Sequence, residues 1–157
     1  MTLNNGVELP LLGFGTFQPT ASQGLGTSDE AAEDAVFTAL KADYRLIDTA
    51  AFYQTEAAVG CALRRAEAEL DIDRADIFVT SKLWVSDTSY DGARRAYGFG
   101  LYRPVSIHNP MNDVFSAWRA LSELLQDGTV RAIGTSNFSR ARLEDFISFN
   151  EVVPQVN

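Results

Sequence analysis

The chain has 157 residues, a length that predicts one domain rather than several. Hydrophobic residues make up 46% of it, which supplies enough apolar bulk for a packed core and excludes an intrinsically disordered chain. Its 13 basic and 21 acidic residues give a formal net charge of −8. Because phosphate backbones repel an acidic surface, this charge argues against nucleic acid as a partner.

Secretory and membrane-spanning segments are not expected. The first residues lack the cationic start and the apolar stretch of a secretory signal, and no apolar run reaches the ~18 residues that a spanning helix needs. Cys61 is the single cysteine, which excludes an intrachain disulfide, and its place beside Val59 and Leu63 on a helical face predicts a core side chain. These features favour a cytoplasmic protein with no membrane partner.

The first predicted element is a β-hairpin. Asn5-Gly6 is a tight-turn pair because both residue types tolerate positive φ, and an apolar strand over residues 9–15 follows. Residues 18–27 are rich in Gly, Ser and Thr, and they are predicted to form a loop. Thr27 and Glu30 have the spacing of a capping box, which predicts that a helix begins there.

Strand-like and helical segments alternate from residue 44 onward. Strands are expected at residues 44–49, 76–81, 105–108, 130–136 and 152–157. Helices are expected between them, and the last two begin at the N-caps Asn112 or Asp113 and Ser139, with Gly128 ending the first of the two. Strict alternation implies parallel strands with right-handed crossovers, in either a doubly wound open sheet or a (β/α) barrel.

Polar residues distinguish the two architectures. Gly13 and Gly15 match the first two glycines of a dinucleotide-binding fingerprint, but the third is missing and a loop follows in place of a helix. Polar side chains instead cluster at the C-terminal ends of successive strands, at Asp48, Ser81-Lys82, His108 and Ser136-Asn137. Strand ends of this kind form the active-site face of a (β/α) barrel. The sequence therefore predicts an α/β fold, a partial (β/α)8 TIM barrel with about six of the eight strands and an N-terminal β-hairpin, as a single incomplete barrel domain over residues 1–157.

Four residues near these strand ends have complementary chemistry: Asp48, Tyr53, Lys82 and His108. A phenol has a pKa near ~10 in water, and an adjacent ammonium group stabilises its phenolate. A carboxylate beside the lysine would keep that ammonium charged, and a neutral histidine can donate a hydrogen bond to a carbonyl oxygen. Such a set can deliver a proton to a carbonyl under reduction. Because no side chain supplies a hydride, a nicotinamide cofactor is required.

Several strings of the sequence resemble the aldo-keto reductases. They are residues 13–16, 44–50 together with Tyr53 and Glu56, 79–84, 107–110, 118–121 and 128–138. The resemblance extends from about residue 2 to residue 157. It implies a metal-free hydride transfer from NADPH to aldehydes or ketones, which leaves NADP+ and makes a small carbonyl compound the expected partner.

The resemblance also implies roles for individual residues. Tyr53 is expected to be the general acid, Lys82 and Asp48 its tuning pair, and His108 the group that orients the carbonyl.

Contacts with cofactor and substrate follow from the same resemblance. Ser136 and Asn137 are expected to bind the nicotinamide carboxamide, and Thr16 with Asp48 the nicotinamide ribose. Phe17, Trp84 and His108 are expected to line the substrate pocket.

The sequence departs from the family pattern in two places. Residues 96–104 are shorter than the corresponding crossover by roughly two helical turns, and Pro104 is expected only at the start of a strand because it lacks an N–H. The chain also ends before the last strands of the barrel, so we expect a C-terminally truncated member. Because an open barrel exposes two strand edges, self-association through those edges is expected.

Two other functions remain open. The chain is alternatively a non-catalytic fragment of the family that serves as an interaction module or has no independent function. A barrel enzyme that uses Lys82 as a Schiff-base amine is the remote alternative, and the nearby Asp48 argues against it because that chemistry needs an uncharged amine.

Overall fold

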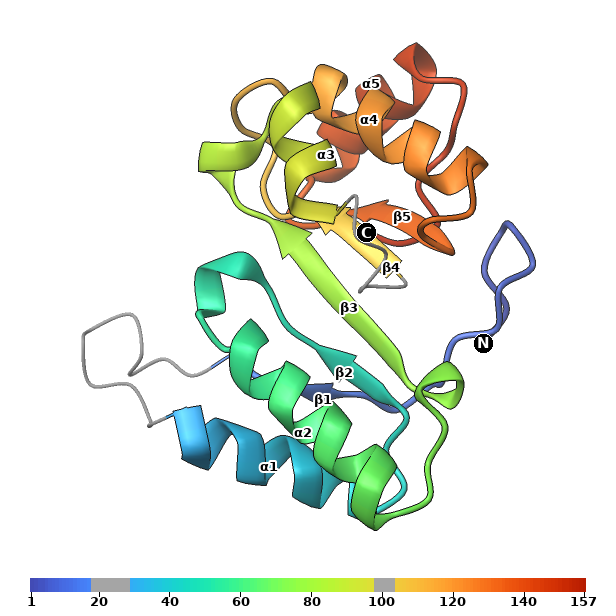
Figure 1. The fold of residues 1–157 in the computed structure, drawn as a ribbon. Helices are drawn as coiled ribbons and strands as arrows, with labels where there is room; N and C mark the ends of the chain where they lie inside the picture. Colours follow the sequence, from blue (N-terminus) through green and yellow to red (C-terminus); the bar gives the residue numbers. More distant parts are fainter. Residues whose placement is uncertain (18–28, 98–103) are drawn as a thin grey trace. The chain divides into compact units, whose positions relative to one another are not determined.

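Strands and α-helices alternate along the chain, as the sequence predicts (Figure 1). The computed structural model describes residues 1–17, 29–97 and 104–157. Within them, each strand is parallel to the next strand in chain order and pairs with it. The strands are β1 (Phe14–Gly15), β2 (Leu46–Asp48), β3 (Phe78–Leu83), β4 (Pro104–Ile107) and β5 (Ala132–Thr135). The predicted loop at 18–27, the Thr27 cap and residues 98–103 of the shortened crossover lie outside the described residues.

The chain divides into two compact units. The first contains Met1 and Leu9–Thr80, and the second contains Thr2–Glu8 and Ser81–Asn157. Strand β3 contributes its first three residues to the first unit and its last three to the second. That residues 1–157 form one domain stays a prediction.

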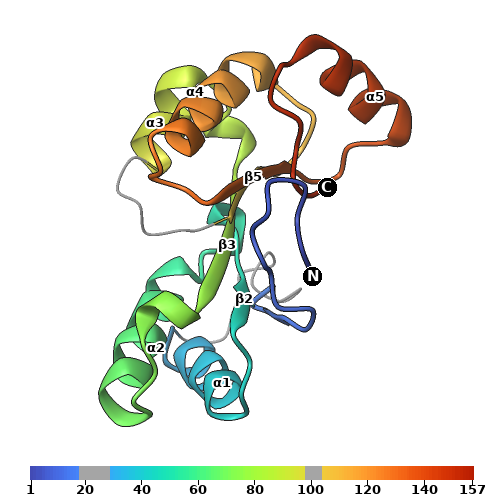
Figure 2. The same cartoon turned by 90° about the vertical axis from the view of Figure 1, so that its right-hand side faces the viewer.

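In the first unit, the helices α1 (Asp29–Lys41) and α2 (Glu56–Glu69) pack against each other and cover one face of β1 and β2 (Figures 1 and 2). Their contact is apolar and almost fully buried, and the inner face of α2 consists of buried Val59, Ala62, Leu63 and Ala66. At the edge of this contact, Arg65 binds Asp34 at 2.7 Å and lies over the Phe37 ring. Cys61 is half-buried rather than in the core, because it lies toward the Arg64 side chain, whose Nη2 donates to Sγ.

In the second unit, three helices cover β4 and β5: α3 (Tyr90–Tyr97), α4 (Val114–Gln126) and α5 (Arg140–Phe149). Local signals placed the starts of α4 and α5 and the end of α4 well. Asp113 accepts from the Ser116 N–H and Ser139 from the Arg142 N–H, which confirms both N-caps. Gly128 ends α4 in the left-handed region at φ +79°, as predicted.

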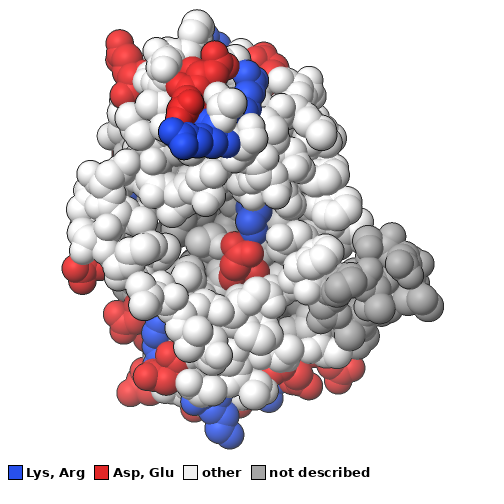
Figure 3. Space-filling view, turned by 180° about the vertical axis from the view of Figure 1, so that it is seen from behind, with Lys and Arg blue, Asp and Glu red and all other residues white. Residues whose placement is uncertain are grey.

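Figure 3 shows one face of the molecule, where Lys and Arg groups lie singly or beside acidic groups.

The predicted hairpin at the N-terminus is also present in the second unit. Its two sides meet at one antiparallel bridge between Thr2 and Glu8, and Gly6 adopts φ +83° in the turn. The turn is attached to the rest of the unit because the Asn5 side chain donates to the Arg131 carbonyl at 2.9 Å.

Several strand boundaries differ from the prediction. The strand expected at 9–15 consists only of β1, and Leu11 before it is 85% exposed. The strand expected at 76–81 begins later, because residues 74–76 form a 3-10 turn in which the Ala75 N–H donates to the Asp73 side chain. Pro104 begins β4, where its missing N–H is tolerated, as predicted. The sixth strand, expected at 152–157, is reduced to a single parallel bridge between Gly134 and Val156.

Within the described parts of the chain, we find no helix that combines the length and the apolar character required to cross a membrane.

Candidate active site

The first group of predicted site residues follows β1 and β2 in the first unit. Gly15 pairs with Asp48, and the Thr16 N–H continues this ladder by donating to the Asp48 carbonyl at 2.9 Å. Tyr53 ends a 3-10 turn over Ala51–Tyr53, in which its N–H donates to the Ala50 carbonyl at 2.9 Å. The structure therefore brings Thr16, Asp48 and Tyr53 to neighbouring strand ends of one unit.

The Asp48 carboxylate is held by a hydroxyl that the sequence analysis did not identify. Thr80 is the strand partner of Asp48 in the parallel register, and its Oγ1 donates to Asp48 Oδ1 at 2.5 Å. A hydrogen bond to an ionised acceptor is shorter and stronger than a neutral one. This bond orients the Asp48 carboxylate at the end of β2.

Aromatic rings lie beside this group. The Phe17 and Tyr53 rings are 5.0 Å apart between centroids and tilted by 52°. Phe17 is half-exposed, so one side of its ring is available for an apolar ligand. This placement is compatible with the substrate-lining role predicted for Phe17.

Three threonine hydroxyls of the first unit, those of Thr16, Thr49 and Thr55, form a buried cluster. Thr55 Oγ1 lies 2.8 Å from Thr16 Oγ1 and 3.1 Å from Thr49 Oγ1. All three residues are buried. The cluster joins Thr16 and Thr49, which directly follow β1 and β2, to Thr55, which directly precedes α2.

The second group of predicted site residues follows β3 and β4 in the second unit. Lys82 is half-buried in the last part of β3, opposite Ser106, rather than just after the strand as predicted. His108 follows β4 and is 8% exposed, and its N–H donates to the Leu83 carbonyl at 3.1 Å. The Trp84 ring meets the His108 ring edge-on, with centroids 5.2 Å apart. His108 therefore lies directly after the end of β4, beside Trp84.

Ser136 and Asn137 follow β5 in the same unit. The Asn137 backbone is in the left-handed region at φ 60°, which Asn adopts more readily than most residues. Its Nδ2 donates to the His108 carbonyl at 2.9 Å and lies 3.3 Å from Ser136 Oγ. Asn137 thus joins the end of β5 to the end of β4, which places both predicted carboxamide ligands next to His108.

The predicted site residues therefore divide between the units. Thr16, Phe17, Asp48 and Tyr53 belong to the first, and Lys82, Trp84, His108, Ser136 and Asn137 belong to the second. Thr49, Thr55 and Thr80 were not among the site residues predicted from the sequence. A hydroxyl residue directly after a strand was the only sequence signal for Thr49, whereas the partners of Thr55 and Thr80 depend on the fold.

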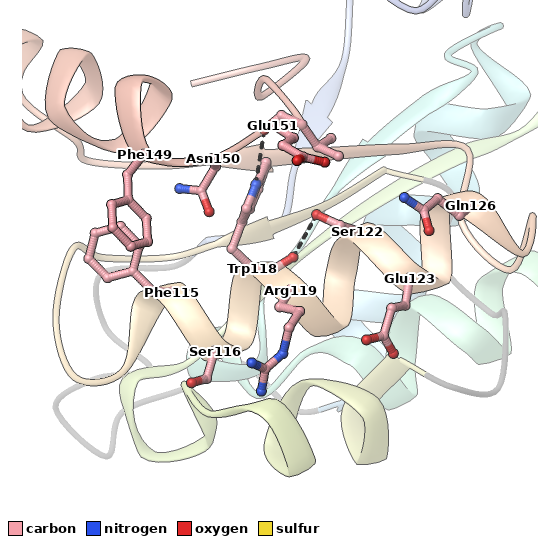
Figure 4. A pocket seen from close by; sticks show the side chains of 11 residues that line it. Phe115, Ser116, Trp118, Arg119, Ser122, Glu123, Gln126, Phe149, Asn150 and Glu151 are labelled. Carbon is pink, nitrogen blue, oxygen red and sulfur yellow. Dashed lines mark hydrogen bonds between the residues drawn. The ribbon is translucent and has the colours of Figure 1, made fainter.

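The second unit contains a surface cavity of about 410 Å³ (Figure 4). It is bounded by α4 and by the segment that follows α5, and it is lined by Phe115, Ser116, Trp118, Arg119, Ser122, Glu123, Gln126, Phe149, Asn150, Glu151 and Val152. Its inner side is closed where Trp118 Nε1 donates to the Val152 carbonyl at 3.0 Å. None of the predicted site residues lines this cavity.

A polar network beside that cavity contains a perturbed tyrosine. Tyr90 donates to Glu123 at 2.6 Å, and Arg94 binds the same carboxylate oxygen at 3.0 Å. The hydrogen bond to Glu123 raises the pKa of Tyr90, because the carboxylate stabilises the protonated phenol. This network links α3 to α4 and contains no predicted site residue.

Comparisons with known proteins agree with the resemblance seen in the sequence. The sequence profile of the Aldo/keto reductase family matches residues 11–156. The chain is 38% identical to a morphine 6-dehydrogenase of Pseudomonas putida over 167 residues, which cover 100% of this chain and 52% of that protein. It is also 38% identical to a glyoxal reductase of Bacillus subtilis over 163 residues, which cover 99% of this chain and 55% of that protein.

A solved structure of an aldo-keto reductase of Bombyx mori in complex with NADP matches with a TM-score of 0.91 at 30% identity. The match covers 100% of this chain and 56% of that one. The chain therefore spans about half the length of the curated relatives and of the solved structure that it matches.

Proposed function

Because the chain belongs to the aldo/keto reductase family, we propose that it reduces aldehydes or ketones to alcohols with NADPH as hydride donor and Tyr53 as general acid. The observation that carries this proposal is the position of the polar residues. In each unit, they lie at or just beyond the carboxyl ends of parallel strands. This is the edge at which (β/α) barrel enzymes carry their active sites.

Each acid–base residue has a role in this proposal. Tyr53 donates its phenolic proton to the carbonyl oxygen, and Lys82 stabilises the phenolate that is left, since an ammonium group offsets its negative charge. Asp48, oriented by Thr80, acts as the partner of Lys82. His108 donates a hydrogen bond to the carbonyl oxygen and thereby aims it at Tyr53.

The residues after β5 fit a nicotinamide carboxamide. That group presents an NH2 donor and a carbonyl acceptor. Asn137 Oδ1 accepts no hydrogen bond from the described residues, and the Ser136 hydroxyl can donate, so the pair offers the complementary acceptor and donor. Thr16 is proposed to contact the ribose. When bound, NADPH supplies the hydride that no side chain can provide.

The substrate is proposed to be a small carbonyl compound that packs against Phe17 and Trp84. Both rings lie beside a proposed acid–base residue, Phe17 next to Tyr53 and Trp84 next to His108. The two relatives carry the names of a glyoxal reductase and a morphine 6-dehydrogenase, and these names refer to very different substrates. The proposal is therefore limited to the carbonyl class. We further propose that the protein acts in the cytoplasm.

A second candidate function is a non-catalytic interaction module that associates with itself or with another protein. Its support is the set of exposed large apolar side chains in the described residues, among them Leu11, Leu12, Phe149 and Val153. Exposed apolar side chains favour association when they are contiguous on a surface.

The experiment that tests the proposal measures NADPH oxidation with a reactive aromatic aldehyde. Three proteins are compared: the wild type, Tyr53→Phe, and the matched control Tyr44→Phe, whose ring lies beside Phe14. We expect the rate to fall by at least about 100-fold in Tyr53→Phe, the usual contribution of a general acid, and to persist in Tyr44→Phe.

Equal turnover in wild type and Tyr53→Phe would refute the general-acid role. If a folded wild-type chain neither binds NADPH nor turns over, the second candidate is favoured. Sedimentation of that same sample then tests whether the chain self-associates.

A further inference from the structure

Thr55 stands at the N-cap position of α2 but does not cap the helix. A Thr at this position normally accepts a hydrogen bond from one of the first helical N–H groups. No such bond is formed by Thr55. Asp113 and Ser139 do form it at the starts of α4 and α5, so α2 differs from these two helices.

The Thr55 hydroxyl instead binds two other hydroxyls. Its Oγ1 lies 2.8 Å from Thr16 and 3.1 Å from Thr49, and the exposures of Thr16, Thr49 and Thr55 are 4%, 0% and 7%. A hydroxyl carries one proton, so Thr55 donates to at most one of these partners and accepts from at least one. Because buried hydroxyls are costly to leave without partners, these three hydrogen-bonded hydroxyls are a fixed part of the unit.

The residues next to the cluster explain why its position matters. Thr16 directly precedes Phe17, and Thr55 follows Tyr53 by two residues, while the Phe17 and Tyr53 rings lie 5.0 Å apart. The hydrogen bond between Thr16 and Thr55 therefore ties together the two backbone segments that carry these rings.

The turn before Thr55 is one that needs such support. Gln54 adopts φ 57°, in the left-handed region that few residues other than Gly occupy, and its N–H reaches the Ala51 carbonyl at 3.3 Å. Strained backbone of this kind persists only where its surroundings hold it, and departures from local rules concentrate at functional sites.

We propose that Thr55 is a positioning residue, whose hydroxyl bonds to Thr16 and Thr49 hold the Tyr53 phenol and the Phe17 ring in place. The hydroxyl that would cap α2 is used to hold the turn that carries Tyr53. That Tyr53 is the proton donor rests on the proposed function, whereas the structural role of Thr55 does not.

The test compares Thr55→Val, which keeps the side-chain shape but removes the hydroxyl, with Thr55→Ser, which keeps the hydroxyl. Ser122→Ala in α4 is the control, because among the described residues its hydroxyl bonds only to the Trp118 carbonyl, in the second unit. Hydrogen exchange is followed at the Tyr53 and Gln54 amides, and the Tyr53 ring is observed by NMR with ring-labelled tyrosine, its signal assigned by its loss in Tyr53→Phe.

We expect exchange at the two amides to rise about tenfold in Thr55→Val, as for the loss of one buried hydrogen bond. The Tyr53 ring signal shifts in the same variant. Thr55→Ser restores both, and Ser122→Ala changes neither. If Thr55→Val does not fold, Thr49→Val removes one of the two bonds and is expected to give a smaller rise at the same amides.

Unchanged exchange and an unchanged Tyr53 signal in Thr55→Val would overturn the proposal. So would a rise spread evenly over α1 and α2, which would mark general destabilisation. In the aldehyde assay, kcat should fall in Thr55→Val with little change in the KM for NADPH. If the wild type proves inactive, the proposed function fails while the exchange and NMR measurements still decide the role of Thr55.

Discussion

Gly134 in β5 should not tolerate even a methyl group. A Cβ built on Gly134 would lie 2.4 Å from Val156 Cγ2 and 2.8 Å from the Val156 carbonyl oxygen. It would also lie 2.8 Å from Ser106 Oγ on the neighbouring strand. Gly134→Ala therefore pushes the Gly134–Val156 bridge apart, and with it the hydrogen bond from the Thr135 N–H to the Val156 carbonyl at 3.0 Å.

The expected cost follows from two opposing effects. Overpacking a filled site costs roughly 1–3 kcal/mol of unfolding free energy, whereas replacing Gly by Ala gains about 0.4–1 kcal/mol by restricting the unfolded chain. Two of the three close contacts of Gly134 involve Val156, and one of these is with backbone, which cannot rotate away. The net destabilisation should therefore be about 1–2 kcal/mol, or a fall in Tm of about 2–4 °C for each kcal/mol.

Gly15→Ala is the matched control, because Gly15 is also in a strand and a Cβ there would meet no atom within 4 Å. Urea unfolding should give a lower midpoint for Gly134→Ala and an equal or higher one for Gly15→Ala. Adding Val156→Ala to Gly134→Ala removes the side-chain clash but leaves the carbonyl, so it should recover part of the loss. Equal midpoints for the two single variants would show that the segment ending at Val156 does not pack against β5.

Two further predictions concern carboxylates. Thr80→Val removes the hydrogen bond to Asp48 and should cost about 1–2 kcal/mol of unfolding free energy, with Thr80→Ser close to wild type; equal stability of all three proteins would contradict this. The Ser86 hydroxyl and the Arg95 guanidinium lower the pKa of Asp87, so this carboxylate stabilises the fold above its ordinary pKa and loses that effect as the pH falls through the lowered value. The free energy of unfolding should therefore fall less between pH 7 and low pH in Asp87→Asn than in the wild type. An equal fall in both proteins would refute the stabilising role of the Asp87 carboxylate.

Much of the candidate site could be predicted because its motifs are short. Asp48 is the last residue of β2, and His108 and Ser136 directly follow β4 and β5, at the strand ends where the alternating pattern placed them. Lys82 differed slightly, since β3 lies two residues further along the chain than predicted at both ends and therefore includes it. A 3-10 turn capped by Asp73 occupies the position where the strand was expected to begin, and a side chain that caps a 3-10 turn looks the same in sequence as one that caps a helix.

By itself, the sequence determined the order of strands and helices, the starts of α4 and α5, the end of α4 and the positions of the polar residues at strand ends. These features are local: the Asp113 cap bonds three residues ahead, and Gly128 turns the chain by its own φ. Only the tertiary structure decided that Thr80 holds Asp48 and that Thr55 binds Thr16 instead of capping α2. Those partners are separated by 32 and 39 residues, and a hydroxyl chooses among such partners only once packing has brought them within hydrogen-bonding distance.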